Sequence, residues 1–262
     1  MLAPGPRHRL KDLSFNKLIP NILTVLALCA GLTAIRFGLQ GRFEHAVVSI
    51  VLAGILDALD GRIARMLGGS TKFGAEMDSL ADVVDFGVAP AVLLFQWTMS
   101  AAGSIGWALV LLYCVCCALR LARFNTRLGA SDLPPWAYKF FTGVPAPAAA
   151  GLVLTPMMVS FELGSAFFGH VLVNAVVIIG VSALMVSRVP TYSGKSIRVP
   201  QRHVLPLLLL VGLTAGFVVG APWSTLPVFA LIYVGSIPFS YVEFHRLADE
   251  TAKHYHPANS EE

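Results

Sequence analysis

Long apolar blocks separated by short polar connections run through the chain, and they restrict the folds available to it. The first block, 18–39, contains a single charged residue, Arg36. A helix crosses the hydrocarbon core of a bilayer with about 20 predominantly apolar residues. The pattern therefore predicts an all-α polytopic membrane helical bundle with about eight transmembrane helices. The expected spans are 18–39, 44–66, 80–100, 104–124, 143–162, 166–187, 203–220 and 225–242.

Composition argues against a soluble globular domain. Only 13% of the 262 residues are charged, whereas soluble domains have about 25%. The last two blocks have a second interpretation, because Ala221-Pro222-Trp223 separates them. A re-entrant hairpin over 203–242 is the alternative to two full spans.

Basic residues predict the orientation of the bundle. Short cytoplasmic loops are enriched in Lys and Arg. Of the 19 basic residues, all but Arg36 and Arg42 lie on one set of alternating connections or at the chain ends. We therefore expect a cytoplasmic or interfacial segment at 1–17, a single transmembrane domain at 18–242 and a cytoplasmic tail at 243–262. The net charge of +4 fits anionic lipid headgroups, and no nucleic-acid partner is expected.

Aspartates are concentrated in and beside the second and third spans. A carboxylate inside a membrane helix costs roughly 2.5–3.5 kcal/mol on insertion scales and commonly marks a functional site. Asp57 and Asp60 are three residues apart, and Asp78 and Asp82 are four apart, so each pair shares a helix face. Because the connection between the spans is short and rich in glycine, we expect the two pairs to face each other near the cytoplasmic boundary.

Four carboxylates in one cleft repel one another unless cations compensate them. Hard divalent cations prefer oxygen ligands, and a pair of them can form a two-metal clamp for phosphoryl transfer. Gly61 and Ala64 interrupt the acidic face and leave room for a substrate, and Arg65 is placed to pair with phosphate. Two alternatives use the same carboxylates: an ion or proton pathway in a transporter, and buried salt bridges with Arg62 and Arg65.

The aspartates belong to the pattern D-x2-D-G-x2-A-R-x8-G-x3-D-x3-D, which resembles the motif of the CDP-alcohol phosphotransferase family at all eight positions. These positions are Asp57, Asp60, Gly61, Ala64, Arg65, Gly74, Asp78 and Asp82. The resemblance implies a six-helix catalytic core, two divalent cations (Mg2+ or Mn2+) and a CDP-linked lipid as donor.

The resemblance also assigns roles to the motif residues. It implies that Asp57, Asp60 and Asp78 bind metal. Asp82 would also touch metal, and it would take the proton from the acceptor hydroxyl. Binding of the CDP-lipid is implied for Asp57, Asp60, Gly61, Ala64, Arg65, Gly74 and Asp78.

Other stretches, chiefly 78–82, 86–90, 118–125 and 141–147, are similar to the branch of this family that transfers phosphatidyl groups to serine in bacteria. The similarity covers about 18–200. It implies CDP-diacylglycerol and L-serine as substrates, CMP as a product, and a homodimer in the cytoplasmic (inner) membrane with its active site facing the cytoplasm. Other acceptors stay open: glycerol 3-phosphate, inositol or its phosphate, and choline.

The carboxylate of a serine acceptor requires a cationic partner. Arg120 and Arg123, at the cytoplasmic end of the fourth span, are the preferred candidates, followed by Asn125 and Lys195. Ordinary positive-inside anchoring is the other interpretation of the two arginines. Asp85 departs from the family pattern, in which a small polar residue is commoner.

Overall fold

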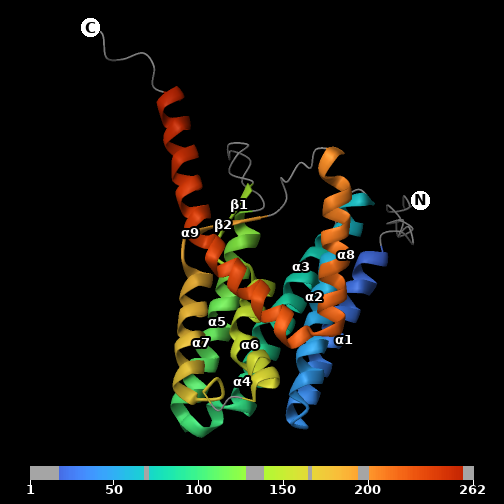
Figure 1. Cartoon of the computed structure of the whole chain (residues 1–262), viewed down its shortest axis with the longest axis vertical. Helices are drawn as coiled ribbons and strands as arrows, with labels where there is room; N and C mark the ends of the chain where they lie inside the picture. The colour runs from blue at the N-terminus through green and yellow to red at the C-terminus, as the bar shows by residue number, and fades with distance from the viewer. Residues whose placement is uncertain (1–17, 68–70, 128–138, 165–166, 194–200, 256–262) are drawn as a thin grey trace, which may run out of the picture.

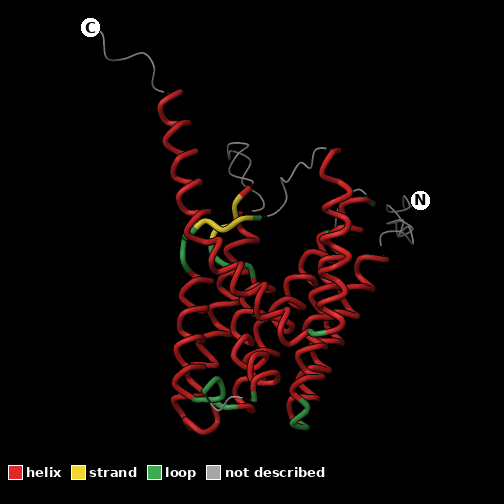
Figure 2. The backbone as a smooth tube through the Cα atoms, in the orientation of Figure 1, coloured by secondary structure: helices red, strands yellow, loops and turns green. Residues whose placement is uncertain are grey.

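The computed structural model describes residues 18–67, 71–127, 139–164, 167–193 and 201–255, and nearly all of them are helical (Figure 1, Figure 2). The expected all-α fold is confirmed. Single helices occupy seven of the eight expected spans, and the span 80–100 is an almost continuous run of four helical elements, the last of which is a 3-10 turn at Met99–Ala102. The helices are α1 (Leu18–Leu39), α2 (Phe43–Met66), α3 (Lys72–Asp82), a π-helical turn (Val83–Val88), α4 (Ala89–Trp97), α5 (Gly103–Arg127), α6 (Ala146–Leu163), α7 (Val171–Val186), α8 (Val204–Gly220) and α9 (Pro222–Tyr255).

Among the described residues, four helical segments are long and apolar enough to cross a bilayer. They are Leu18–Leu39, Met99–Thr126, Ala146–Leu163 and Pro222–Thr251. Helices α7 and α8 are apolar but shorter. Helix α2 has 24 residues, and it carries the charged motif that lowers its hydropathy. The structure is that of an integral membrane protein.

The last helix extends beyond the expected span. We expected a polar tail after residue 242, but α9 continues to Tyr255. Arg246 and Glu250 form an exposed ion pair of 3.0 Å on this extension, and such i,i+4 pairs stabilise a helix. Figure 1 shows the turn between α8 and α9 above the lower ends of α1 and α7, so this hairpin ends short of that level.

A small antiparallel sheet closes one end of the bundle (Figure 2). Strand β1 (Phe140–Thr142) pairs with β2 (Pro190–Tyr192), with Phe141 opposite Thr191. Gly143, directly after β1, has φ +76°, and a Cβ there would lie 2.6 Å from Met185 O. Because only glycine adopts this conformation without steric cost, the sheet can sit close to the end of α7.

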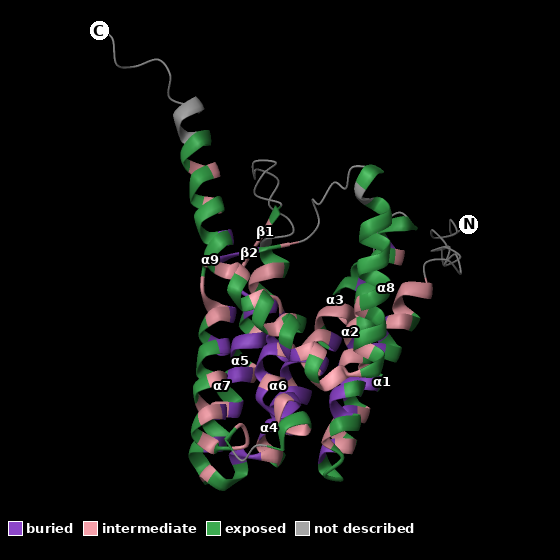
Figure 3. Ribbon diagram, in the orientation of Figure 1, coloured by how far each residue is buried: buried purple, intermediate pink, exposed green. Residues whose placement is uncertain are grey.

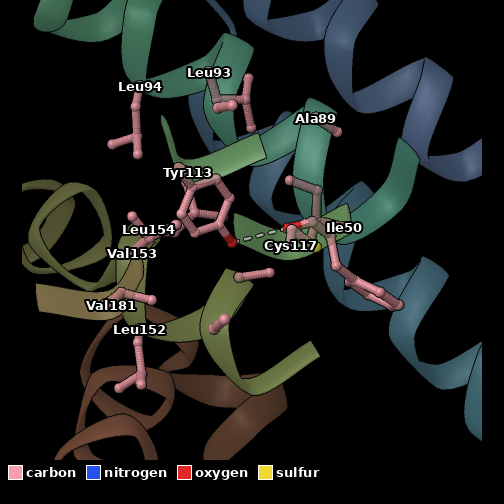
Figure 4. Packing of buried hydrophobic residues seen from close by; sticks show 14 of the residues in the cluster. Ile50, Ala89, Leu93, Leu94, Tyr113, Cys117, Leu152, Val153, Leu154 and Val181 are labelled. Atoms are coloured by element: carbon pink, nitrogen blue, oxygen red, sulfur yellow. Dashed lines mark hydrogen bonds between the residues drawn. The ribbon is translucent and has the colours of Figure 1, made fainter. Parts of the chain in front are cut away.

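The core lies among α4, α5, α6, α7 and the π-helical turn (Figure 3), whereas α8 buries none of its residues. Tyr113 of α5 is fully buried, and its hydroxyl donates to Phe86 O over 2.8 Å (Figure 4). Cys114 Sγ also contacts Gly87 O, at 3.6 Å. A π turn contains an extra residue and is frequent at functional sites. The two contacts hold this turn, which follows Asp82 directly, against the core.

Candidate active site

The acidic side chains of α2 and α3 meet at one end of the bundle. Carboxylate oxygens of Asp57, Asp60 and Asp78 lie within 4.8 Å of one another. Asp82 lies beside this cluster, within hydrogen-bonding reach of Asp57. The two aspartate pairs therefore face each other across the helices, as their spacing predicts.

Helix α1 completes the cluster, and the sequence reasoning missed its part. Thr24 Oγ1 donates a 2.6 Å hydrogen bond to Asp60 Oδ2, and Asp60 is only 3% exposed. Asn21, one turn earlier, lies so close to α3 that a Cβ on Gly74 would be 2.6 Å from Asn21 Oδ1. The sequence did contain a signal for this contact: Asn21 and Thr24 are polar residues three positions apart at the start of an apolar span.

Gly74, for which the resemblance implies CDP-lipid binding, lies in the first turn of α3. Its N–H donates to Thr71 Oγ1 over 3.0 Å, so that Thr71 caps the helix. The absence of a side chain at Gly74 serves the close approach of α1 and α3.

A cleft of about 320 Å3 opens beside the cluster and gathers most of the motif. Its motif residues are Asp60, Gly61, Ala64, Arg65, Gly74 and Asp78. Asp57 and Asp82 are not among the described residues that line it. A Cβ on Gly61 would have no described atom within 4 Å, so this glycine leaves open space, as expected. Phe124, Asn125 and Ser79 complete one wall.

No described Lys or Arg side chain forms a salt bridge with the cluster. Within the described ranges, the only ion pair joins Arg246 and Glu250, so the alternative of salt bridges with Arg62 and Arg65 is not supported. Oxygens on opposite sides of one bound Mg2+ or Ca2+ ion are about 4–5 Å apart. Three carboxylates within 4.8 Å therefore fit a hard divalent cation in both size and chemistry.

Arg120 and Arg123, the preferred candidates for binding an acceptor carboxylate, lie in different surroundings. Arg120 is 8% exposed; it stacks over Phe124 at 5.5 Å from the ring centroid, within electrostatic reach of Asp57 and Asp82. Arg123 instead donates to Val186 O over 2.7 Å, at the end of α7.

Of the two remaining candidates, Asn125 and Lys195, the structure describes only Asn125. Asn125 Nδ2 donates to Ser79 Oγ over 2.7 Å at the wall of the cleft. Lys195 lies outside the described residues. Of the four candidates, Arg120 is the one brought beside the aspartates.

Asp85, which departs from the family pattern, is packed against α1. It is 1% exposed, and a Cβ on Gly31 would lie 2.0 Å from its Oδ1. We predict that Gly31→Ala lowers the free energy of unfolding by about 1–3 kcal/mol, the usual cost of overpacking. Thermal unfolding of the purified protein in detergent measures the change.

Gly180→Ala is the matched control, because a Cβ on this glycine of α7 has no described atom within 4 Å. It should not lower Tm. Replacing Asp85 by serine in the Gly31→Ala background should recover part of the loss. A Gly31→Ala variant as stable as the wild type would contradict the contact.

Comparisons with known proteins agree on one family. The profile of the CDP-alcohol phosphatidyltransferase family matches residues 17–186, and that of CDP-alcohol phosphatidyltransferase 2 matches 202–238. The CDP-diacylglycerol–serine O-phosphatidyltransferase of Mycobacterium leprae is 41% identical over 86% of this chain and 74% of its own length. The enzyme of that name from Helicobacter pylori is 34% identical over 83% and 88%. The archaetidylserine synthase of Methanothermobacter thermautotrophicus is 35% identical over 65% and 68%.

Proposed function

The chain belongs to the CDP-alcohol phosphatidyltransferase family, and from this premise we propose that it is a phosphatidylserine synthase. It transfers the phosphatidyl group of CDP-diacylglycerol to the hydroxyl of L-serine and releases CMP. The observation that carries the proposal is the meeting of Asp57, Asp60 and Asp78 beside Asp82 at the edge of a cleft. Serine as the acceptor is supported by the names of the bacterial and archaeal relatives.

Asp57, Asp60 and Asp78 are the residues that would hold divalent cations, Mg2+ or Mn2+, with Asp82 at the border of the site. Bound ions of this kind neutralise diphosphate oxygens and the charge that develops on the leaving phosphate. The oxygen-only cluster supports this assignment. Thr24 supports it too, since its hydrogen bond to Asp60 orients that carboxylate, and partners of metal ligands commonly do this.

Asp82 acts as the general base. It takes the proton from the serine hydroxyl while the serine oxygen attacks the β-phosphorus of the donor. The bond from that phosphorus to the bridging oxygen breaks, and its electron pair leaves with CMP. The position of Asp82 beside the three clustered carboxylates, and not within their group, supports a role in proton transfer.

The remaining motif residues bind the nucleotide end of the donor. Gly61 and Ala64 leave space along α2, and Arg65 lines the same cleft, where its guanidinium is suited to bind a phosphate. The distribution of basic residues supports a cleft that faces the cytoplasm, with both termini on that side of the inner membrane. The catalytic domain spans 18–242, and two such chains form a homodimer.

We propose that Arg120 binds the carboxylate of serine, and that Arg123 has a structural role. Arg120→Gln should raise the KM for serine about 10-fold or more, because a hydrogen-bonded charge contributes about 1.5–3 kcal/mol. Arg123→Gln removes the bond to Val186 O, so it should lower Tm and leave that KM within about twofold. Steady-state kinetics with varied serine test both variants. The reverse pattern would transfer the role to Arg123.

The decisive experiment measures the release of CMP by the purified enzyme from CDP-diacylglycerol in the presence of Mn2+. Serine, glycerol 3-phosphate, inositol, inositol phosphate and choline are supplied one at a time. Release that depends on serine alone is the expected result. Release that depends on another alcohol would move the enzyme to another branch of the family. An absence of release with every alcohol, from a folded protein, would refute the assignment.

A further inference from the structure

Tyr233 of α9 brings a hydroxyl group close to Arg120 of α5. Within the described ranges no ion pair holds the Arg120 guanidinium. Its side chain is almost fully buried and stacks over the Phe124 ring. The attraction of a cation to a ring face acts on the whole guanidinium and does not select a direction for each N–H group. A hydrogen-bond acceptor is needed to fix that direction.

The Tyr233 hydroxyl has polar neighbours on one side only. The Tyr233 side chain lines an apolar groove of about 430 Å3 between α2, α6 and α9, and no other described residue of that lining has a side-chain oxygen or nitrogen. A water molecule in the groove would lack the two to four polar partners that buried waters have. The hydroxyl itself is buried and makes no hydrogen bond of ordinary geometry. Its partners therefore have to come from Thr191 and Arg120, which lie close to it.

The donors and acceptors of these three side chains fit together in one order only. Thr191 Oγ1 donates its hydrogen to Gly143 O over 2.9 Å, so its lone pairs are left to accept. The Tyr233 hydroxyl can donate to Thr191 Oγ1, and its oxygen can then accept from Arg120. A guanidinium has five N–H groups and no acceptor, so Arg120 can stand only at the donating end of such a chain.

The far end of this chain is held by the small sheet. Thr191 is buried and lies opposite Phe141 in the register of β1 and β2. The Gly143 N–H donates to Val189 O over 2.8 Å, which fixes the peptide next to the accepting carbonyl. Because backbone hydrogen bonds hold both Thr191 and Gly143, they offer Tyr233 an acceptor with a fixed position.

We propose that Tyr233 is a positioning residue. Its hydroxyl donates to Thr191 Oγ1 and accepts a hydrogen bond from Arg120, and this turns the remaining N–H groups of Arg120 toward the carboxylate of serine. A carboxylate binds a guanidinium most strongly through two parallel N–H···O bonds, which require one orientation of the guanidinium. The inference rests on the proposed function, because it takes serine as the acceptor and Arg120 as its partner.

The test measures the KM for serine of the full chain in detergent, with saturating CDP-diacylglycerol and Mn2+. Tyr233→Phe removes one oxygen atom and keeps the ring. It should raise the KM for serine about 3- to 10-fold, the effect of one hydrogen bond. The KM for CDP-diacylglycerol and the kcat at saturating serine should stay within about twofold. Tyr241→Phe, which removes the same atom from an exposed tyrosine of α9, is the matched control and should change none of the three.

Further variants separate positioning from stability. In an Arg120→Gln background, Tyr233→Phe should change the KM for serine less than about twofold, because the group that it orients is absent. Thr191→Val should raise this KM as Tyr233→Phe does, whereas Thr191→Ser, which keeps the hydroxyl, should lie within about twofold of the wild type. A purely structural role of Tyr233 predicts instead a lower Tm and an unchanged KM for serine.

An unchanged KM for serine in the Tyr233→Phe enzyme would overturn the inference. An equal increase of this KM with and without the Arg120 guanidinium would overturn it too. Neither result would affect the assignment of the reaction. If the wild type instead released CMP without any dependence on serine, the proposed function would fail, and this inference would fail with it.

Discussion

Replacing Asp82 with asparagine is expected to reduce kcat by about 10²–10⁴-fold, the range in which positioned general bases contribute. The amide of asparagine has nearly the shape of the carboxylate but cannot accept the proton of the serine hydroxyl. Because Asp82 is not among the described residues that line the polar cleft, the affinity for the CDP-lipid should change less than about threefold. Single-turnover measurements of CMP release, together with equilibrium binding of the donor, separate the two effects.

Glu44→Gln is the matched control for Asp82→Asn. Glu44 is an exposed carboxylate in the first turn of α2, at the end of the helix opposite the motif. This variant should keep the kcat of the wild type. An Asp82→Asn enzyme that turned over at the wild-type rate would show that another group takes the proton.

Replacing Asp60 with asparagine should reduce kcat/KM by at least about 100-fold, because a bound cation supplies several kcal/mol and each 1.36 kcal/mol is a factor of ten. Asp60 is buried, hydrogen-bonded to Thr24 and part of the three-carboxylate cluster. The variant should also bind Mn2+ more weakly, as measured by electron paramagnetic resonance of free Mn2+ without substrate. Asp57→Asn and Asp78→Asn should behave alike.

Removing the metal from the wild-type enzyme tests the same proposed metal site. Dialysis against a chelator should abolish CMP release from the wild type, and Mn2+ or Mg2+ should restore it. Thr24→Val keeps all three carboxylates and removes only the hydrogen bond to Asp60. It should weaken Mn2+ binding by about 10-fold, the lower range for partners of metal ligands. Full activity after exhaustive chelation would exclude the metal site.

The helices and the acidic site were predictable because both depend on local patterns. Hydropathy over about 20 residues identifies a span. A spacing of three or four residues places two carboxylates on one helix face, so the pairs Asp57/Asp60 and Asp78/Asp82 could be assigned before any packing was known. The extension of α9 beyond residue 242 was missed because its last turns are polar. Hydropathy identifies the part of a helix that lies in the membrane, but it does not show whether the helix continues into water.

Contacts between distant segments were not predictable in the same way. Thr24 and Asp60 are 36 residues apart, and nothing in the apolar pattern of α1 indicates which of its faces meets α2 and α3. Arg120 and Arg123 were both candidates for the same role because both lie at the cytoplasmic end of the fourth span. The packing of α7 against α5 instead takes the Arg123 guanidinium to the carbonyl of Val186, while Arg120 lies beside the aspartates.

By itself, the sequence determined that this chain is a membrane bundle with a cluster of aspartates on two consecutive helical segments, because hydropathy and helical spacing act within one segment. The tertiary structure alone decided which residues surround that cluster: Thr24 from α1, Arg120 from α5, and a groove whose walls come from α2, α6 and α9. The physical reason is that a cavity is the space left when helices pack, and its shape depends on side chains that are distant in the chain.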